Sequence, residues 1–178
     1  MIQDEYEYYM YLKQQKQINE YADIIHELYN INVPINNIEE VVSKIGGIVK
    51  YDSNCSYIEK SKTGFIIHVE DNSDYKIKNF RVAQQLGKLF LYTNFIEEHE
   101  LFNNDDEISF KDSYNCEGTI NWVNEFALAF LMPKKEYIDE VYKNTIDNIV
   151  DTKVLAKHFD VSITTASCRG KRLGILKD

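Results

Sequence analysis

The fold is decided by two stretches, of which the more specific is NWVNEFALAFLMP at residues 121–133. The other is NFRVAQQLGKLFL at residues 79–91. In both, apolar side chains recur at intervals of three and four residues, which predicts two helices, over about 77–93 and 118–131. Met132-Pro133 ends the later helix, because proline cannot continue it.

The flanking sequence predicts a mixed α+β domain around these two helices. Apolar periodicity predicts a long helix over residues 3–30 and a shorter one over 35–45, which Gly46-Gly47 ends. Short runs of strand-forming residues predict three strands at 48–51, 56–60 and 64–69, the last two as a hairpin. A further helix is expected at 134–148, before a tail at 151–178.

Tyrosines crowd the first part of the long N-terminal helix, at positions 6, 8, 9 and 11. Two interpretations stay open. Either this aromatic face packs on the core or on a second copy of the chain, or it is an exposed docking surface for a protein partner.

The net charge of −9 is unevenly distributed along the 178 residues. Residues 151–178 carry six Lys or Arg against three Asp, a net of +3, so the first 150 residues carry −12. An acidic body repels phosphate backbones, which argues against nucleic-acid binding anywhere except at the tail.

Cysteine usage and hydropathy favour a cytoplasmic protein without a membrane span. Cys55, Cys116 and Cys168 are odd in number and lack paired spacing, which is typical of reduced thiols. The first residues, MIQDE, are acidic and unlike a secretory leader. The longest apolar run, residues 126–133, is far shorter than the roughly 20 residues that span a bilayer.

The two stretches together resemble the ImmA/IrrE family of small metallopeptidases. That family typically shows R-F-x-x-A-H-E-L-G-H-x-L-L, followed by A-N-x-F-A-x-x-L-L-M-P. Here the best match is Asn124-x-Phe126-Ala127 with Leu131-Met132-Pro133, and the likeness covers residues 18–178. The resemblance implies a zincin-like minimal metallopeptidase fold, with a peptidase-like domain at 1–150 and a helix-turn-helix-like tail at 151–178 packed on it.

In the resembled family, two histidines of the first helix bind zinc and the adjacent Glu is the general base. A Glu on the second helix is the third ligand. At these positions the chain has Gln84 and Lys88 for the histidines, Gln85 for the base, and Trp122 or Asn121 for the third ligand. An amide is a poor zinc ligand, an ammonium repels the ion, and indole only donates. No catalytic residue and no metal cofactor is therefore expected.

The positions that correspond to the zinc site of the resembled family are expected to form a polar binding cleft instead. Its predicted members are His68, Gln84, Gln85, Lys88, Glu117 and Asn124. Lys88 beside Glu117 or Glu125 would replace the positive charge of the metal by an ion pair. The alternative is a relocated metal site that uses Glu117 and His99.

The tail resembles a helix-turn-helix. Asp160 occupies the turn position where glycine is usual, and Ser162 is placed to cap the second helix. Arg169, Lys171 and Arg172 are then the candidates for contact with nucleic-acid phosphates. Because Asp160 replaces glycine and the body is acidic, a structural or partner-docking role is the favoured interpretation.

These observations predict a catalytically inactive pseudopeptidase that acts as a regulatory or protein-binding module. Active relatives are associated with prophages and other mobile elements, where they cleave a helix-turn-helix repressor, so such a repressor is the expected partner. Two alternatives stay open: an active zinc metallopeptidase with atypical ligands, and a DNA-binding regulator that uses the tail.

Overall fold

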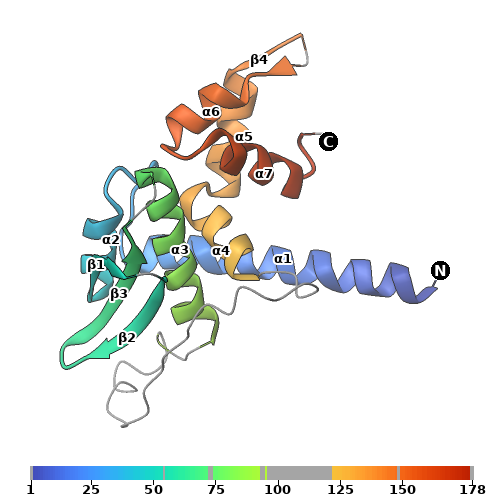
Figure 1. Ribbon diagram of the computed structural model, residues 1–178. Coiled ribbons are helices and arrows are strands. Elements are labelled where there is room, and N and C mark those ends of the chain that lie inside the picture. The colour runs from blue at the N-terminus through green and yellow to red at the C-terminus, as the bar shows by residue number, and fades with distance from the viewer. Residues whose placement is uncertain are drawn as a thin grey trace.

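The chain folds as a mixed α+β protein (Figure 1). The computed structural model describes residues 2–53, 55–71, 74–92, 95, 122–147 and 149–176. The helices are α1 (Ile2–Leu28), α2 (Ile38–Ile45), α3 (Tyr75–Tyr92), α4 (Trp122–Leu131), α5 (Lys134–Lys143), α6 (Thr152–His158) and α7 (Ile163–Arg172). The strands are β1 (Gly47–Ser53), β2 (Tyr57–Ser61), β3 (Gly64–Glu70), β4 (Thr145–Ile146) and β5 (Ile149–Val150).

A three-stranded sheet in the order β1-β3-β2 covers one side of the core. β3 pairs with β2 in antiparallel fashion, which confirms the predicted hairpin, and with β1 in parallel. The predicted end of α2 is also confirmed, because Gly46 takes a left-handed conformation at φ 100° that few other residues adopt. Phe65, Ile67 and Val69 of β3 point into the core.

Helices α3 and α4 pack against each other and supply a large part of the core (Figure 1). They approach closely at Gly87, where an added Cβ would lie 3.0 Å from Cδ1 of Phe126. Phe126 and Phe130 are both fully buried and stack with their ring centroids 5.6 Å apart. The apolar periodicity of the two stretches thus marks the faces that meet in the core.

Helix α1 is buried on one face in its second half and is largely exposed in its first half. Its second half packs on α4 through Ile18, Ala22 and Ile25, whereas its first half extends beyond the rest of the chain (Figure 1). Tyr6, Tyr8 and Tyr9 are each more than 60% exposed. Of the tyrosine face, these three residues therefore do not pack on the described core, whereas Tyr11 stacks on Trp122. Among the described helices, none combines the length and hydropathy needed to cross a bilayer.

The predicted helix over 134–148 is wrong beyond Lys143. The amide of Asn144 donates to the Glu140 carbonyl at 2.8 Å, and the Thr145 hydroxyl donates to the Val141 carbonyl at 2.7 Å. These side chains bind the last carbonyls of α5 and so end the helix. The chain then forms the β4–β5 hairpin, in which Asp147 turns at φ 51°.

Helices α6 and α7 form the helix pair that the tail sequence predicts. Asp160 takes a left-handed conformation between them, and the Ser162 hydroxyl caps α7 by accepting from the Thr165 amide at 3.0 Å. Tyr137 joins α5 to this pair, since its ring stacks on Phe159 and its hydroxyl donates to the Ala166 carbonyl at 2.7 Å. Helix α5 therefore packs with the segment that follows residue 151.

One buried histidine lies between α1 and α4. The ring of His26 sits 4.7 Å from the ring of Phe130, and the residue is 9% exposed. Burial lowers the pKa of His26 to about 4, from an ordinary value of 6.5, because the charged imidazolium loses its hydration.

We expect the free energy of unfolding to fall as the pH drops from about 6.5 towards about 4. Over that range the unfolded chain binds a proton on His26 and the folded chain does not. The loss attributable to His26 between pH 7 and pH 5 should be about 2 kcal/mol. Urea unfolding at both pH values measures it, with His26→Gln as the comparison. Equal pH dependence in the two proteins would contradict the assignment.

Candidate functional site

The positions that resemble the zinc-binding helix lie at the junction of α3 and α4. There the Gln84 amide donates to the Asn124 side-chain oxygen across the two helices, and both residues are half-buried. Gln85 is 1% exposed and Lys88 is half-buried on the same helix. The structure thus joins two of the predicted cleft residues, Gln84 and Asn124, by a direct hydrogen bond.

Trp122, at a predicted third-ligand position, lies away from Gln84. Its ring stacks on Tyr11 of α1, with the centroids 5.6 Å apart. It also lines a hollow of about 390 Å³ with Leu91 and Tyr92, which are two helical turns beyond Gln84. Asn121, Glu117 and His99 lie outside the described residues, so the relocated metal site and part of the predicted cleft lie outside them too.

The side chains at the α3–α4 junction do not fit zinc. Gln84 and Asn124 are neutral amides that bind each other, and Lys88 brings an ammonium group to the same helix. Across the described parts of the chain, no three His, Cys, Asp or Glu side chains converge as metal ligands. No catalytic step through a metal follows from these residues.

His68 lies on the sheet face that points away from the core. Its neighbours Ile67 and Val69 are fully buried in the core, so the alternation of the strand turns His68 to the opposite face. There its Nδ1 is 2.7 Å from the Asp52 carboxylate, and the Tyr57 ring stacks on the imidazole at 4.4 Å. The contacts of His68 are thus with residues of β1 and β2, not with the helix junction.

Arg169 is fully buried, so it is not available to a nucleic-acid phosphate, and that expectation is corrected. Its Nη2 donates to the Asn19 side-chain oxygen at 2.6 Å, and its Nε donates to the Met132 carbonyl at 2.9 Å. Its Nη1 lies 3.4 Å from the Glu125 carboxylate, which also accepts from the Asn19 amide at 3.2 Å. Burial lowers the pKa of Arg169 to about 10, which leaves it charged at neutral pH.

This network joins α1, α4 and α7 and was not predicted from the sequence. Glu125 and Arg169 are 44 residues apart, and Asn19 is 150 residues from Arg169. The sequence contained one indication of this network. Glu125 interrupts an apolar helix, and a charge buried in such a helix needs a partner of opposite charge. The carboxylate of Glu125, which was considered as a partner for Lys88, here binds Asn19 and Arg169.

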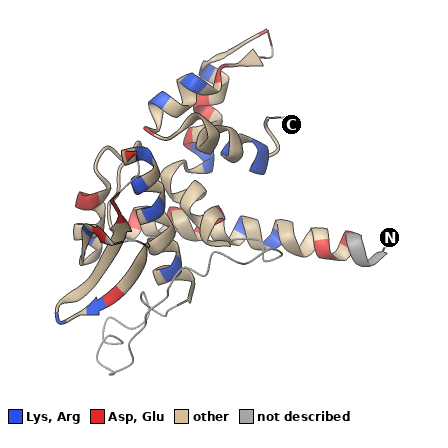
Figure 2. Cartoon of the chain, in the orientation of Figure 1, with Lys and Arg blue, Asp and Glu red and all other residues tan. Residues whose placement is uncertain are grey.

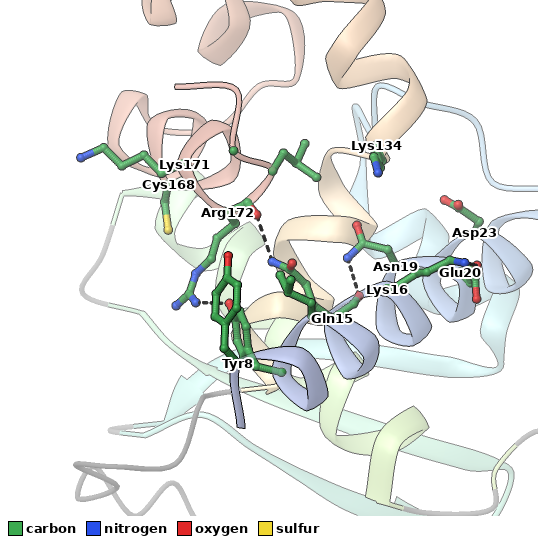
Figure 3. A pocket seen from close by; sticks show the side chains of 14 residues that line it. Tyr8, Gln15, Lys16, Asn19, Glu20, Asp23, Lys134, Cys168, Lys171 and Arg172 are labelled. Carbon is green, nitrogen blue, oxygen red and sulfur yellow. Dashed lines mark hydrogen bonds and ion pairs between the residues drawn. The ribbon is translucent and has the colours of Figure 1, made fainter. Parts of the chain in front are cut away.

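A groove of about 810 Å³ runs between α1 and α7, next to this network (Figure 3). Lys171 and Arg172 stand on its wall, so two of the three predicted phosphate contacts are at the surface. The Arg172 guanidinium donates to the Tyr11 hydroxyl at 2.6 Å, and the Gln15 amide donates to the Arg172 carbonyl at 3.1 Å. Cys168, an exposed free thiol, lies on the same wall.

Replacement of Arg169 by methionine should destabilise the fold by about 3–5 kcal/mol, because the Glu125 carboxylate would stay buried without its cation. The double variant Arg169→Met/Glu125→Leu should recover at least half of that loss. Urea unfolding measures both, with the exposed Lys171→Met as the matched control, which we expect to be nearly neutral. A cost for Arg169→Met no larger than that of the control would show that the network is not essential.

Comparison with known proteins assigns no family: no family model matches the chain, and no curated protein matches it significantly. The resemblance to ImmA/IrrE peptidases therefore rests on the two sequence stretches and on the order of helices and strands around them. Function has to be argued from the geometry of the residues.

Proposed function

We propose that the chain is a non-catalytic, ImmA/IrrE-like pseudopeptidase with a zincin-like fold that acts by binding a protein. The observation that carries this proposal is the hydrogen bond between Gln84 and Asn124, which links α3 to α4 through Gln84, the residue at the first zinc-ligand position of the resembled family. A hydrogen bond between neutral amides connects the helices without a dication. The scaffold would then keep its shape while the chemistry of hydrolysis is lost.

The outer face of the sheet is the binding surface that we favour. Ile48 is 52% exposed and lies in register with Ile66, so two apolar side chains sit at the centre of this face. Tyr57 stacked on His68 extends it with a flat aromatic surface. A central apolar and aromatic patch with a polar rim is the usual anatomy of a protein–protein interface.

The charge of this face and of the body favours a basic partner. Asp52 and Glu59 flank His68 with side chains about half exposed, and Lys50 is the cation paired with His68 in the register. The first 150 residues carry a net charge of −12. Opposite net charge accelerates association and selects partners. A helix-turn-helix repressor, whose DNA-binding surface is basic, fits this requirement and is the class of protein that active relatives cleave.

The purified protein should contain far less than one zinc per chain. Zinc or a chelator should leave the melting temperature unchanged, because a ligand raises it only by binding the folded state. Elemental analysis and thermal melts with and without zinc measure this. A stoichiometric zinc content, together with cleavage of a repressor that the chelator abolishes, would replace the proposal by that of an active metallopeptidase.

Where a neighbouring gene encodes a helix-turn-helix repressor, that repressor is the probe for binding. The double variant Asp52→Lys/Glu59→Lys should weaken binding by about tenfold or more, since it removes two carboxylates from the sheet face. The control Glu27→Lys/Asp139→Lys makes the same change in net charge at exposed positions on α1 and α5. Biolayer interferometry gives the affinities. Equal weakening by both variants would leave only a non-specific charge effect and reject this surface.

A further inference from the structure

The first half of α1 carries an exposed stripe that is complementary to itself. Glu5, Tyr9, Leu12 and Lys16 follow one another at intervals of four, three and four residues, which places them on one face of the helix. All four are exposed, Tyr9 by 63% and Leu12 by 42%. The stripe therefore reads acid, aromatic, aliphatic and base along a helix that extends beyond the rest of the chain (Figure 1).

The order of these residues matches a two-fold axis. If two copies of α1 run antiparallel with the axis between residues 10 and 11, position 5 faces position 16 and position 9 faces position 12. Each contact then occurs twice, as an isologous interface requires. Glu5 meets the partner's Lys16, and Tyr9 meets the partner's Leu12. Figure 2 shows the same polarity, with acid near the N-terminal end of α1 and base further along.

The groove between α1 and α7 would receive the end of the partner helix. Leu12 and Lys16 of the stripe belong to its lining, so an antiparallel helix that covers the stripe continues into the groove. Its walls carry four cations and two carboxylates: Lys16, Lys134, Lys171, Arg172, Glu20 and Asp23. The groove is thus net positive, and the entering segment brings Glu5 on the face that meets it. This charge favours a second copy over a basic partner.

We propose that the chain self-associates as a two-fold symmetric dimer, in which the exposed stripes of two α1 helices pair antiparallel and each helix start enters the groove of the other copy. This contact covers Tyr9 and Leu12, which are 63% and 42% exposed in the described structure. The proposal does not depend on the proposed function, because the sheet face around His68 belongs to different elements.

Sedimentation equilibrium of the full chain over a range of concentrations tests the dimer. The native protein should show a monomer–dimer equilibrium. Glu5→Lys turns two attractive contacts into two repulsive ones, so the dissociation constant should rise about tenfold. Glu7→Lys makes the same charge change on the other side of the helix and should alter the constant little. Circular dichroism and melting temperature verify that each variant is folded.

Mixing gives the decisive test of the antiparallel pairing. Lys16→Glu alone should also dissociate, but an equimolar mixture of Glu5→Lys and Lys16→Glu should form a heterodimer about as tight as the native dimer. In that mixture every contact between positions 5 and 16 is attractive again. A native chain that stays monomeric, equal effects of Glu5→Lys and Glu7→Lys, or a mixture no tighter than its components would each overturn the proposal.

Discussion

A charge buried among three helices governs the arrangement of this protein. Arg169 is completely removed from water, and a guanidinium in that position is tolerated only if its donors are matched. Asn19 on α1, Glu125 on α4 and the Met132 carbonyl supply the acceptors, at 2.6, 3.4 and 2.9 Å. Since these partners lie on α1 and on α4 with the residue that follows it, a shift of α7 would strand a buried charge. The C-terminal helices are therefore held in one position against α1 and α4.

That arrangement changes what the basic tail does. With Arg169 inside, Arg172 faces α1 across the groove and is bound to Tyr11 (Figure 3). The guanidinium of Arg172 is thus directed towards another helix of the same chain, in a groove of net positive charge beside an acidic helix start. The tail thus has the sequence pattern of a nucleic-acid-binding element, but in the folded chain α7 forms one wall of a groove that suits an acidic helix.

At the α3–α4 junction, the residues that set the packing differ from the polar residues beside them. Gly87 against Phe126, with the stacked Phe126 and Phe130, sets how closely the two helices approach, and these residues are apolar and buried. Gln84 and Asn124 lie at the half-buried margin of the same contact. A change of side chain at this margin therefore need not alter the packing beneath it.

Features that depend on neighbouring residues could be predicted from the sequence: the two core helices, the β2–β3 hairpin, the glycine end of α2, and the capped helix pair with Asp160 in the turn. Through the resemblance, the sequence also placed Gln84 and Asn124 in one predicted cleft. It misjudged the end of α5, because Asn144 and Thr145 bind carbonyls that periodicity does not register. Three features emerged only in the folded chain: Arg169 is buried, His68 faces away from the core, and Trp122 stacks on Tyr11. These outcomes depend on contacts between residues far apart in the chain, where packing and desolvation, not local propensity, determine the lowest free energy.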